Sequence, residues 1–250
     1  MGGHSHWAGI KHKKALVDAK RGKVWTRIVR EITIAARLGG GSPEGNPRLR
    51  KAVDDAKAAN MPADNVKRAI QKGTGEIPGV TYEELTYEGY GPAGVAVYCE
   101  ATTDNRNRTT SEIRKIFENH GGKMGSGGSV AWIFQPKGYL SVKKSAASED
   151  AVMTLAIDNG AEDFRAQESD VYEIITAPAD FERVKNALSS RSIAVESGEL
   201  TMLPSSEVRV EGSDAQKLLN LVEALEGHDD IKNVYANFDI PDQVLSQLDK

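Results

Sequence analysis

The first part of the chain carries apolar residues at helical spacing. Between residues 11 and 38 they recur every three or four positions, as one buried helix face requires (Val24, Trp25, Ile28, Val29, Ile32 and Ala36). A second helix is predicted over 47–59, with Asn46 as its N-cap and a proline in its first turn. A third, shorter helix follows Pro62. Three helices without strands predict a helical domain over residues 1–80.

After a short linker the pattern changes to the alternation that is typical of strands. Residues 82–88 and 95–101 are predicted strands, separated by a glycine-rich turn. The capping box Thr109-Thr110-Ser111-Glu112 predicts that a helix begins there. Residues 130–134 are the next predicted strand, which gives the order ββαβ.

Residues 136–204 follow a different order. Predicted strands and helices alternate as βαββαβ, at 139–142, 149–159, 161–166, 171–176, 180–188 and 193–196. This order is ferredoxin-like, with two helices covering one face of an antiparallel sheet. The chain then continues with a strand at 208–210, a helix from Ser213 to Leu225 and a strand at 231–238.

These last elements have no sheet of their own, so they are predicted to complete the earlier ββαβ unit. The sequence therefore predicts an α+β multidomain protein that begins with a three-helix domain. Residues 81–135 and 205–240 form a split α+β domain, and residues 136–204 are a ferredoxin-like α+β domain inserted into it.

Composition narrows the class of protein. No stretch approaches the roughly 18 apolar residues of a membrane helix, and the basic N-terminus lacks the apolar segment of a secretory signal. The single cysteine, Cys99, excludes an internal disulfide framework and fits a reducing compartment. We expect a soluble, cytoplasmic monomer without a membrane segment.

Charge is divided unevenly along the chain. The net charge of −4 conceals 16 Lys and Arg against 6 Asp and Glu in residues 1–75, a net +10. Residues 76–250 carry 16 against 30, a net −14. This division predicts that the first part binds a polyanion. The alternative is a helical domain whose basic faces dock on the acidic remainder.

A dense cationic run is the main candidate site. Lysines and arginines, with a tryptophan and a histidine among them, suit contacts to the phosphates of a nucleic acid (Trp7, Lys11, His12, Lys13, Lys14, Lys20, Arg21, Lys23, Arg27 and Arg30). Trp7 lies outside the apolar stripe and could stack on an unpaired base, or anchor the N-terminal residues to the first domain. Arg106 and Arg108, beside a predicted helix start, form a second candidate anion site. The alternative there is a tight structural loop.

Other motifs do not predict chemistry. The glycine-rich loop at 121–129 lacks the Ser or Thr that a P-loop needs after its lysine, because Met124 stands there. The histidines near the N-terminus have no cysteine or acidic cluster beside them, so no metal site is predicted. No catalytic constellation is evident, and we expect neither a cofactor nor enzymatic activity.

Several motifs together resemble the YebC family. They include Gly3-His4-Ser5-His6-Trp7, Asp18-Ala19-Lys20-Arg21-Gly22-Lys23, Asn46-Pro47-Arg48-Leu49-Arg50, Asn60-Met61-Pro62, Tyr87-Glu88-Gly89-Tyr90-Gly91-Pro92 and Thr103-Asp104-Asn105-Arg106-Asn107-Arg108-Thr109. The resemblance implies a helical first domain followed by two α+β domains. Family members are described as DNA-binding transcriptional regulators, as mitochondrial translational activators of cytochrome c oxidase, or as ribosome-associated factors. His6 departs from the lysine expected in the family's opening.

Three functions remain open at this point. The first is a nucleic-acid-binding regulator of gene expression, whose partner is DNA, or ribosomal RNA, tRNA and the ribosome. The second is a protein–protein adaptor that docks through its acidic C-terminal region, and the third is a hydrolase. The charge division and the resemblance both favour the first.

Overall fold

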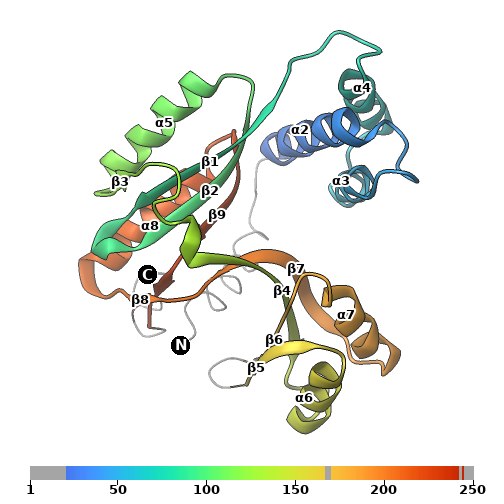
Figure 1. The fold of residues 1–250 in the computed structure, drawn as a ribbon, viewed down its shortest axis with the longest axis vertical. Helices are drawn as coiled ribbons and strands as arrows, with labels where there is room; N and C mark the ends of the chain where they lie inside the picture. Colours follow the sequence, from blue (N-terminus) through green and yellow to red (C-terminus); the bar gives the residue numbers. More distant parts are fainter. Residues whose placement is uncertain (1–20, 167–169, 242–243, 245–250) are drawn as a thin grey trace. The chain divides into compact units, whose positions relative to one another are not determined.

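The computed structural model describes residues 21–166, 170–241 and 244, which divide into two compact units. The described residues of the helix–sheet unit are 21–129 and 212–234, and those of the ferredoxin-like unit are 130–211, apart from 167–169, with 235–241 and 244. Figure 1 shows the elements of both units. Among the described residues, no helix combines the length and apolar composition needed to cross a membrane.

The helix–sheet unit begins with three helices, α2 (Arg21–Gly39), α3 (Pro47–Ala58) and α4 (Ala63–Thr74). Asn46 caps α3 as predicted, because its Oδ1 accepts from the backbone N of Leu49 at 3.0 Å. Its Nδ2 donates to the carbonyl oxygens of Ala35 and Gly40 at 2.7 and 2.9 Å. One side chain therefore joins the start of α3 to the end of α2.

A separate core holds these helices together. Its buried residues come from all three helices and the turn before α4 (Ile32, Ala35, Ala36, Leu49, Ala52, Ala56, Met61 and Ala69), with Trp25, Ile28 and Val29 packed against them. The apolar stripe predicted from the sequence is thus the inner face of α2. The Nε1 of Trp25 also donates to the carbonyl of Ala59 at 3.0 Å.

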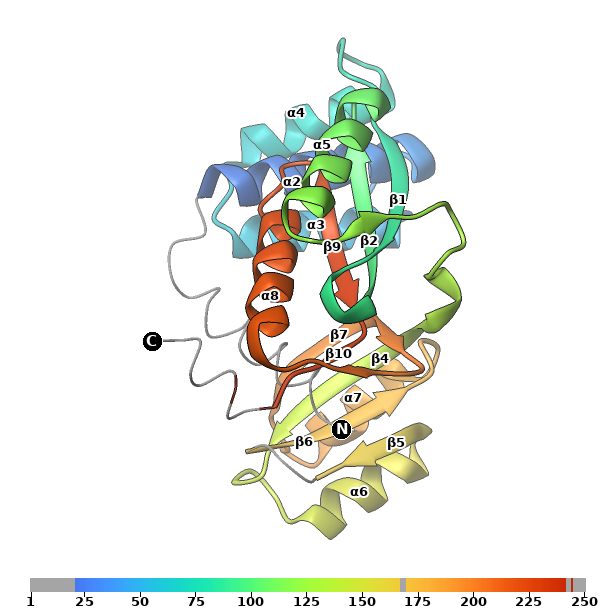
Figure 2. The same cartoon turned by 90° about the vertical axis from the view of Figure 1, so that its left-hand side faces the viewer.

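The same unit contains a four-stranded sheet in the order β3-β1-β2-β9. Its strands are β1 (Glu83–Tyr90), β2 (Ala96–Thr103), β3 (Lys123–Met124) and β9 (Ile231–Ala236), and the short 3-10 turn η1 (Pro92–Gly94) joins β1 to β2. Helices α5 (Arg106–Asn119) and α8 (Gly212–Glu226) lie over one face of it, as Figure 2 shows. The prediction that the C-terminal helix and strand complete this unit is correct for α8 and β9.

The predicted capping box at Thr109 is wrong. Helix α5 begins three residues earlier, at Arg106, and its N-cap is Asn105, whose Oδ1 accepts from the backbone N of Arg108 at 3.1 Å. Thr109 lies inside the helix and is buried. Arg106 and Arg108 therefore belong to the first turn of a helix rather than to the loop before it.

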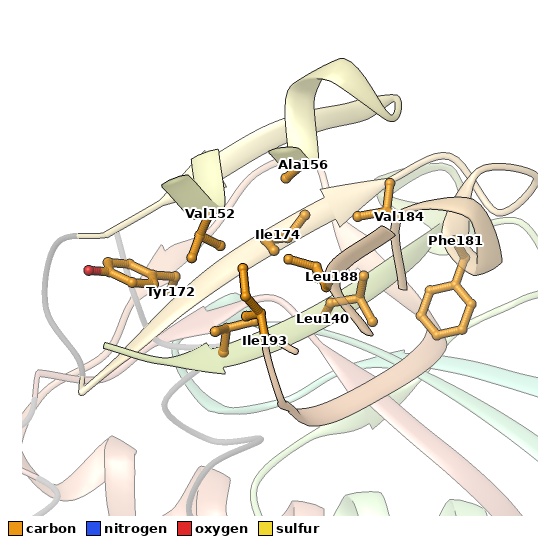
Figure 3. Close-up of a cluster of buried hydrophobic side chains, with 10 residues drawn as sticks. Leu140, Val152, Ala156, Tyr172, Ile174, Phe181, Val184, Leu188 and Ile193 are labelled. Carbon is orange, nitrogen blue, oxygen red and sulfur yellow. The ribbon is translucent and has the colours of Figure 1, made fainter. Parts of the chain in front are cut away.

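The ferredoxin-like unit has the predicted order of elements. It consists of β4 (Phe134–Lys143), α6 (Glu149–Asp158), β5 (Ala161–Arg165), β6 (Val171–Thr176), α7 (Phe181–Ser190) and β7 (Val195–Pro204). The sheet order is β5-β6-β4-β7 and every neighbouring pair is antiparallel. Figure 3 shows the core between this sheet and its helices, with Leu140, Ile174, Val184 and Leu188 among the buried side chains.

Two predicted strands of this region differ from the structure. Residues 131–133 form the 3-10 turn η2 (Ala131–Ile133) instead of a strand, and β4 then runs unbroken from Phe134. Pro136 lies inside β4, opposite Met202 of β7. The strand predicted at 208–210 does not join the β1–β2 sheet. It forms β8 (Val208–Arg209), which pairs in parallel with β10 (Phe238–Asp239).

Gly73 tests the packing of α4 against α2. A Cβ at this position would clash with the carbonyl oxygen of Thr33 and lie 2.8 Å from the Cβ of Ala36. Alanine is the better helix former by about 1 kcal/mol, yet Gly73→Ala is expected to lower the free energy of unfolding by about 1 to 3 kcal/mol through overpacking. Chemical denaturation measures the change.

Gly45→Ala is the matched control, because a Cβ there meets no atom within 4 Å. It should leave the stability of the protein unchanged within about 0.5 kcal/mol. A Gly73→Ala variant that is more stable than the parent would show that α2 and α4 do not pack as closely as described.

Candidate nucleic-acid interface

The structure describes only part of the predicted cationic run. Six of the predicted contact residues lie outside the described residues (Trp7, Lys11, His12, Lys13, Lys14 and Lys20). Arg21 is the first residue of α2. The remaining three, Lys23, Arg27 and Arg30, are spaced by four and three residues, so they share one face of this helix.

That face of α2 lies against the turn between α8 and β9. The Nζ of Lys23 donates to the carbonyl of Gly227 at 2.6 Å and lies 3.5 Å from a carboxylate oxygen of Asp229. Arg27 donates to the carbonyl of Glu226 and, at 3.2 Å, to that of His228. Burial lowers the pKa of Arg27, although Glu226 and Asp229 oppose the shift. These cations bind backbone oxygens within their own unit.

Arg30 reaches the most deeply buried charge of this turn. Its Nη1 lies 2.8 Å from a carboxylate oxygen of Asp230, whose side chain is only 3% exposed, and donates to the carbonyl of Asp229 at 2.6 Å. The other oxygen of Asp230 accepts from Arg108 at 2.7 Å, from Thr109 at 2.6 Å and from Thr103 at 3.1 Å. We call this set the Asp230 cluster.

The Asp230 cluster keeps its carboxylate charged. Burial alone would raise the pKa of Asp230, but the hydrogen bonds from Thr109 and Arg108 and the charge of Arg30 outweigh it and lower the pKa. The pKa of Arg108 is raised, chiefly by its hydrogen bond to Asp230. A buried charge with this many donors is stable where an unpaired one would be costly.

A polar groove of about 600 Å³ lies beside the cluster, within the helix–sheet unit. Its lining includes Lys23 and Arg30 of α2, Lys115 of α5, and the turn residues 227–230. The Nε2 of His228 is 2.9 Å from Glu112, and its Nδ1 accepts from the backbone N of Asp230 at 3.1 Å. Glu112, His228 and Asp230 come close enough to hold a metal ion. A metal cation bound there would lie near the positively charged guanidinium groups of Arg30 and Arg108, which already bind Asp230.

A second set of ion pairs ties α2 and α3 to the sheet. Arg48 of α3 contacts Glu31 of α2 and Glu84 of β1, both at 2.6 Å, and Lys232 of β9 lies 3.0 Å from Glu31. These hydrogen bonds raise the pKa of Arg48. The basic helices therefore do dock on acidic residues of the following domain, which is the alternative that the charge division allowed.

The structure separates the two arginines of the second candidate site. Arg108 belongs to the Asp230 cluster and also contacts Asp104 at 2.9 Å. The guanidinium of Arg106 is exposed and has no partner among the described residues, and it lines a different groove beside β1. Arg108 thus has a structural contact of the kind that the loop alternative described, whereas anion binding by Arg106 stays a prediction.

Sequence reasoning missed a group of exposed cations on α4. Lys67, Arg68 and Lys72 are exposed, and no ion-pair partner for them exists in the described part of the chain. The signal was available, since Lys67, Arg68 and Lys72 alternate with the inward-facing Val66, Ala69 and Ile70. Among the described residues, these three side chains form an accessible group of cations on one helix.

The glycine-rich loop has a structural contact. The backbone N of Gly125 donates to the carbonyl of Glu88 at 2.8 Å, and that of Gly128 to the buried Glu88 carboxylate at 2.7 Å. A carboxylate at the centre of this loop disfavours bound phosphate. Cys99 is buried in β2, and burial raises the pKa of its thiol, as expected of a core residue.

Comparisons with known proteins cover nearly the whole chain. A model of the TACO1/YebC N-terminal domain matches residues 5–76, and a model of the TACO1/YebC second and third domain matches residues 82–238. Two relatives named "Probable transcriptional regulatory protein" are each 55% identical. The one from Endomicrobium trichonymphae aligns over 99% of both chains, and the one from Elusimicrobium minutum over 100% of both.

A solved structure is also similar. The crystal structure of a conserved hypothetical protein from Aquifex aeolicus matches with a TM-score of 0.80 and 49% sequence identity, over 96% of this chain and 99% of that one. The likeness in sequence and fold therefore extends over nearly all of the chain.

Asp230→Asn tests the cluster. At pH 7 the substitution is expected to lower the free energy of unfolding by about 3 kcal/mol, the lower end of the cost of breaking a buried ion pair. The lower end applies because Arg108 is 41% exposed and can be solvated. Asp54→Asn, at a side chain that is 61% exposed, is the control and should change stability by less than about 0.5 kcal/mol.

The pH dependence of this difference follows from the lowered pKa of Asp230. A carboxylate whose pKa is lowered by folding stabilises the protein fully above its unfolded pKa of about 3.9, and the contribution is lost as pH falls through the folded pKa. Urea denaturation should show the gap between parent and Asp230→Asn narrowing below about pH 4. A gap that stays constant down to pH 2 would contradict a charged Asp230.

Proposed function

From the chain's membership of the TACO1/YebC family, we propose that it is a nucleic-acid-binding regulator of gene expression that acts without catalysis. The family models and the relatives at 55% identity agree with the resemblance seen in the sequence motifs. The names of these relatives support a regulatory role, and the charge of the first domain supports nucleic acid as the partner.

The observation that carries the proposal is the surplus of positive charge in residues 1–75, which is +10. Four cations of this domain, Lys23, Arg27, Arg30 and Arg48, bind groups on other elements of the same unit. In our proposal these residues hold the domain in place. The phosphate contacts come from the cations before them (Lys11, Lys13, Lys14, Lys20 and Arg21).

In the proposal, the accessible cations of α4 add further phosphate contacts. Lys67, Arg68 and Lys72 lack partners in the described chain and sit on a helix whose other face is buried in the same core. Contacts of this kind position a protein on the nucleic-acid backbone without reading its sequence. Trp7 adds a base-stacking contact, which favours a partner with unpaired bases.

The negative charge of the remaining residues limits the part of the protein that can contact nucleic acid in this proposal. Residues 76–250 carry a net charge of −14 and would be repelled by phosphates. The titratable residues of the Asp230 cluster bind one another instead of forming a nucleophile–base pair. Both features favour a binding protein over a hydrolase. Experiment must distinguish whether its partner is DNA, ribosomal RNA or tRNA.

The test replaces Lys11, Lys13, Lys14, Lys20 and Arg21 by glutamine in the intact chain. Log affinity for nucleic acid should fall with log salt at a slope of about −0.9 per phosphate contact on duplexes and about −0.7 on single strands. With roughly five contacts the parent slope lies between about −3 and −5, and the variant should lose most of it. Fluorescence anisotropy with duplex DNA, single-stranded RNA and an RNA hairpin of matched length gives the slopes.

A charge-matched control replaces five exposed cations elsewhere in the chain by glutamine (Lys123, Lys143, Arg191, Arg209 and Lys217). It should bind as the parent does. Equal affinity and salt slope for parent and N-terminal variant would refute the proposal. Binding of a protein partner that persists in high salt would instead support the adaptor alternative.

A further inference from the structure

Strand β1 is a sheet edge that is only partly covered. Its partner on the outer side, β3, is two residues long and pairs only at Gly89 with Met124 and Tyr90 with Lys123. The backbone N of Gly125 then bonds to the carbonyl of Glu88, and the chain leaves the edge. Within the described residues, no strand pairs with Glu83–Tyr87 on this side.

The hydrogen bond from Gly125 to Glu88 shows in which direction the unpaired backbone groups of β1 point. In a strand the N–H and C=O of one residue point to the same side, and successive residues alternate. Because the Glu88 carbonyl points away from β2, the N–H and C=O of Glu84 and Thr86 point the same way. They form a row of donors and acceptors at strand spacing.

Helix α5 overhangs this edge. A groove of about 510 Å³ is lined by residues 85–88 of β1, by Arg106, Asn107 and Thr110 of α5, and by the loop after β3. Figures 1 and 2 show α5 running alongside β1 over the same face of the sheet. The groove therefore has a strand edge as one wall and the first two turns of a helix as the other.

We propose that this groove binds an extended peptide segment of a partner protein, which adds to β1 as a further strand in line with β3. Strand addition in a groove between a sheet edge and a helix draws its affinity from main-chain hydrogen bonds. Alternate side chains of the added strand then meet different surroundings, which provides specificity.

Charge defines the sequence that fits. The hydroxyls of Tyr87 and Thr110 lie 3.1 Å apart, so the side chain of Tyr87 is on the α5 side and those of Glu84 and Glu88 are on the other. On the α5 side the peptide meets the unpartnered Arg106. The segment therefore carries an acidic residue facing α5 and neutral or basic residues on the opposite face.

The same charges disfavour a nucleic-acid strand. Glu83 and Glu84 are exposed at the start of β1, one on each face of the strand, and their carboxylates would repel a chain of phosphates. The backbone donors and acceptors alternate along the edge, whereas a phosphate backbone offers acceptors alone. Peptide recognition is therefore a second activity, separate from the cationic surface of the first domain.

The experiment selects random ten-residue peptides, displayed on phage, against the intact protein. Side chains alternate between the two faces of a strand. Selected peptides should therefore carry an acidic residue among the positions that face α5, and neutral or basic residues at the positions between them. On binding, the amide protons of Glu84 and Thr86 should exchange at least tenfold more slowly, as NMR measures. Selection against Arg106→Glu should change the acidic preference to a basic one.

Thr86→Pro removes an N–H that points away from β2 and should weaken peptide binding at least tenfold. Thr86→Ser keeps that N–H and should bind like the parent, and circular dichroism checks that both variants fold. Selected peptides that leave the Glu84 and Thr86 amides unprotected, or a selection that enriches no peptide, would overturn the proposal. So would a ten-residue oligouridine probe that protects the same amides and loses affinity in Arg106→Ala.

Discussion

The carboxylate of Asp230 holds the first domain in its position against the sheet. It receives donors from α2, from β2 and from the first turn of α5, and it sits in the turn between α8 and β9. An unpaired charge at 3% exposure would cost several kcal/mol. Each of these elements must therefore keep its position for the charge to be tolerated. Arg30 of the basic domain and Arg108 of α5 stabilise the fold for that reason.

This constraint explains what the charge pattern could and could not predict. Counting charges showed the surplus of cations in residues 1–75, because the count needs no knowledge of the partners of those cations. It could not show that Arg30 and Arg108 meet the same carboxylate, which is 200 and 122 residues away along the chain. Nor could it single out Arg106, which lies in the same helical turn as Arg108 but faces a different groove. The presence of a cation can be read from the local sequence, whereas its partner depends on residues that are distant along the chain.

The same distinction holds for the fold. The cap at Asn46 was predictable because its acceptor bonds an amide three residues away. The box at Thr109 had equally good local chemistry, but the Thr109 hydroxyl bonds Asp230, and Asn105 takes the capping position. The ferredoxin-like order followed from periodicity alone. The pairing of β8 with β10 did not, since two-residue strands carry no period and are defined by their partners.

Salt acts differently on the two kinds of cation in the first domain. Exposed charges separated by solvent are screened within about 8 Å at physiological ionic strength, and buried pairs are screened much less. The Arg30–Asp230 pair, at 13% and 3% exposure, should therefore persist at salt concentrations that release phosphate contacts. In a test of the proposed function, loss of nucleic acid with rising salt would then report on the accessible cations and not on undocking of the domain. The buried ion pair is what makes the salt dependence of binding interpretable in terms of the surface alone.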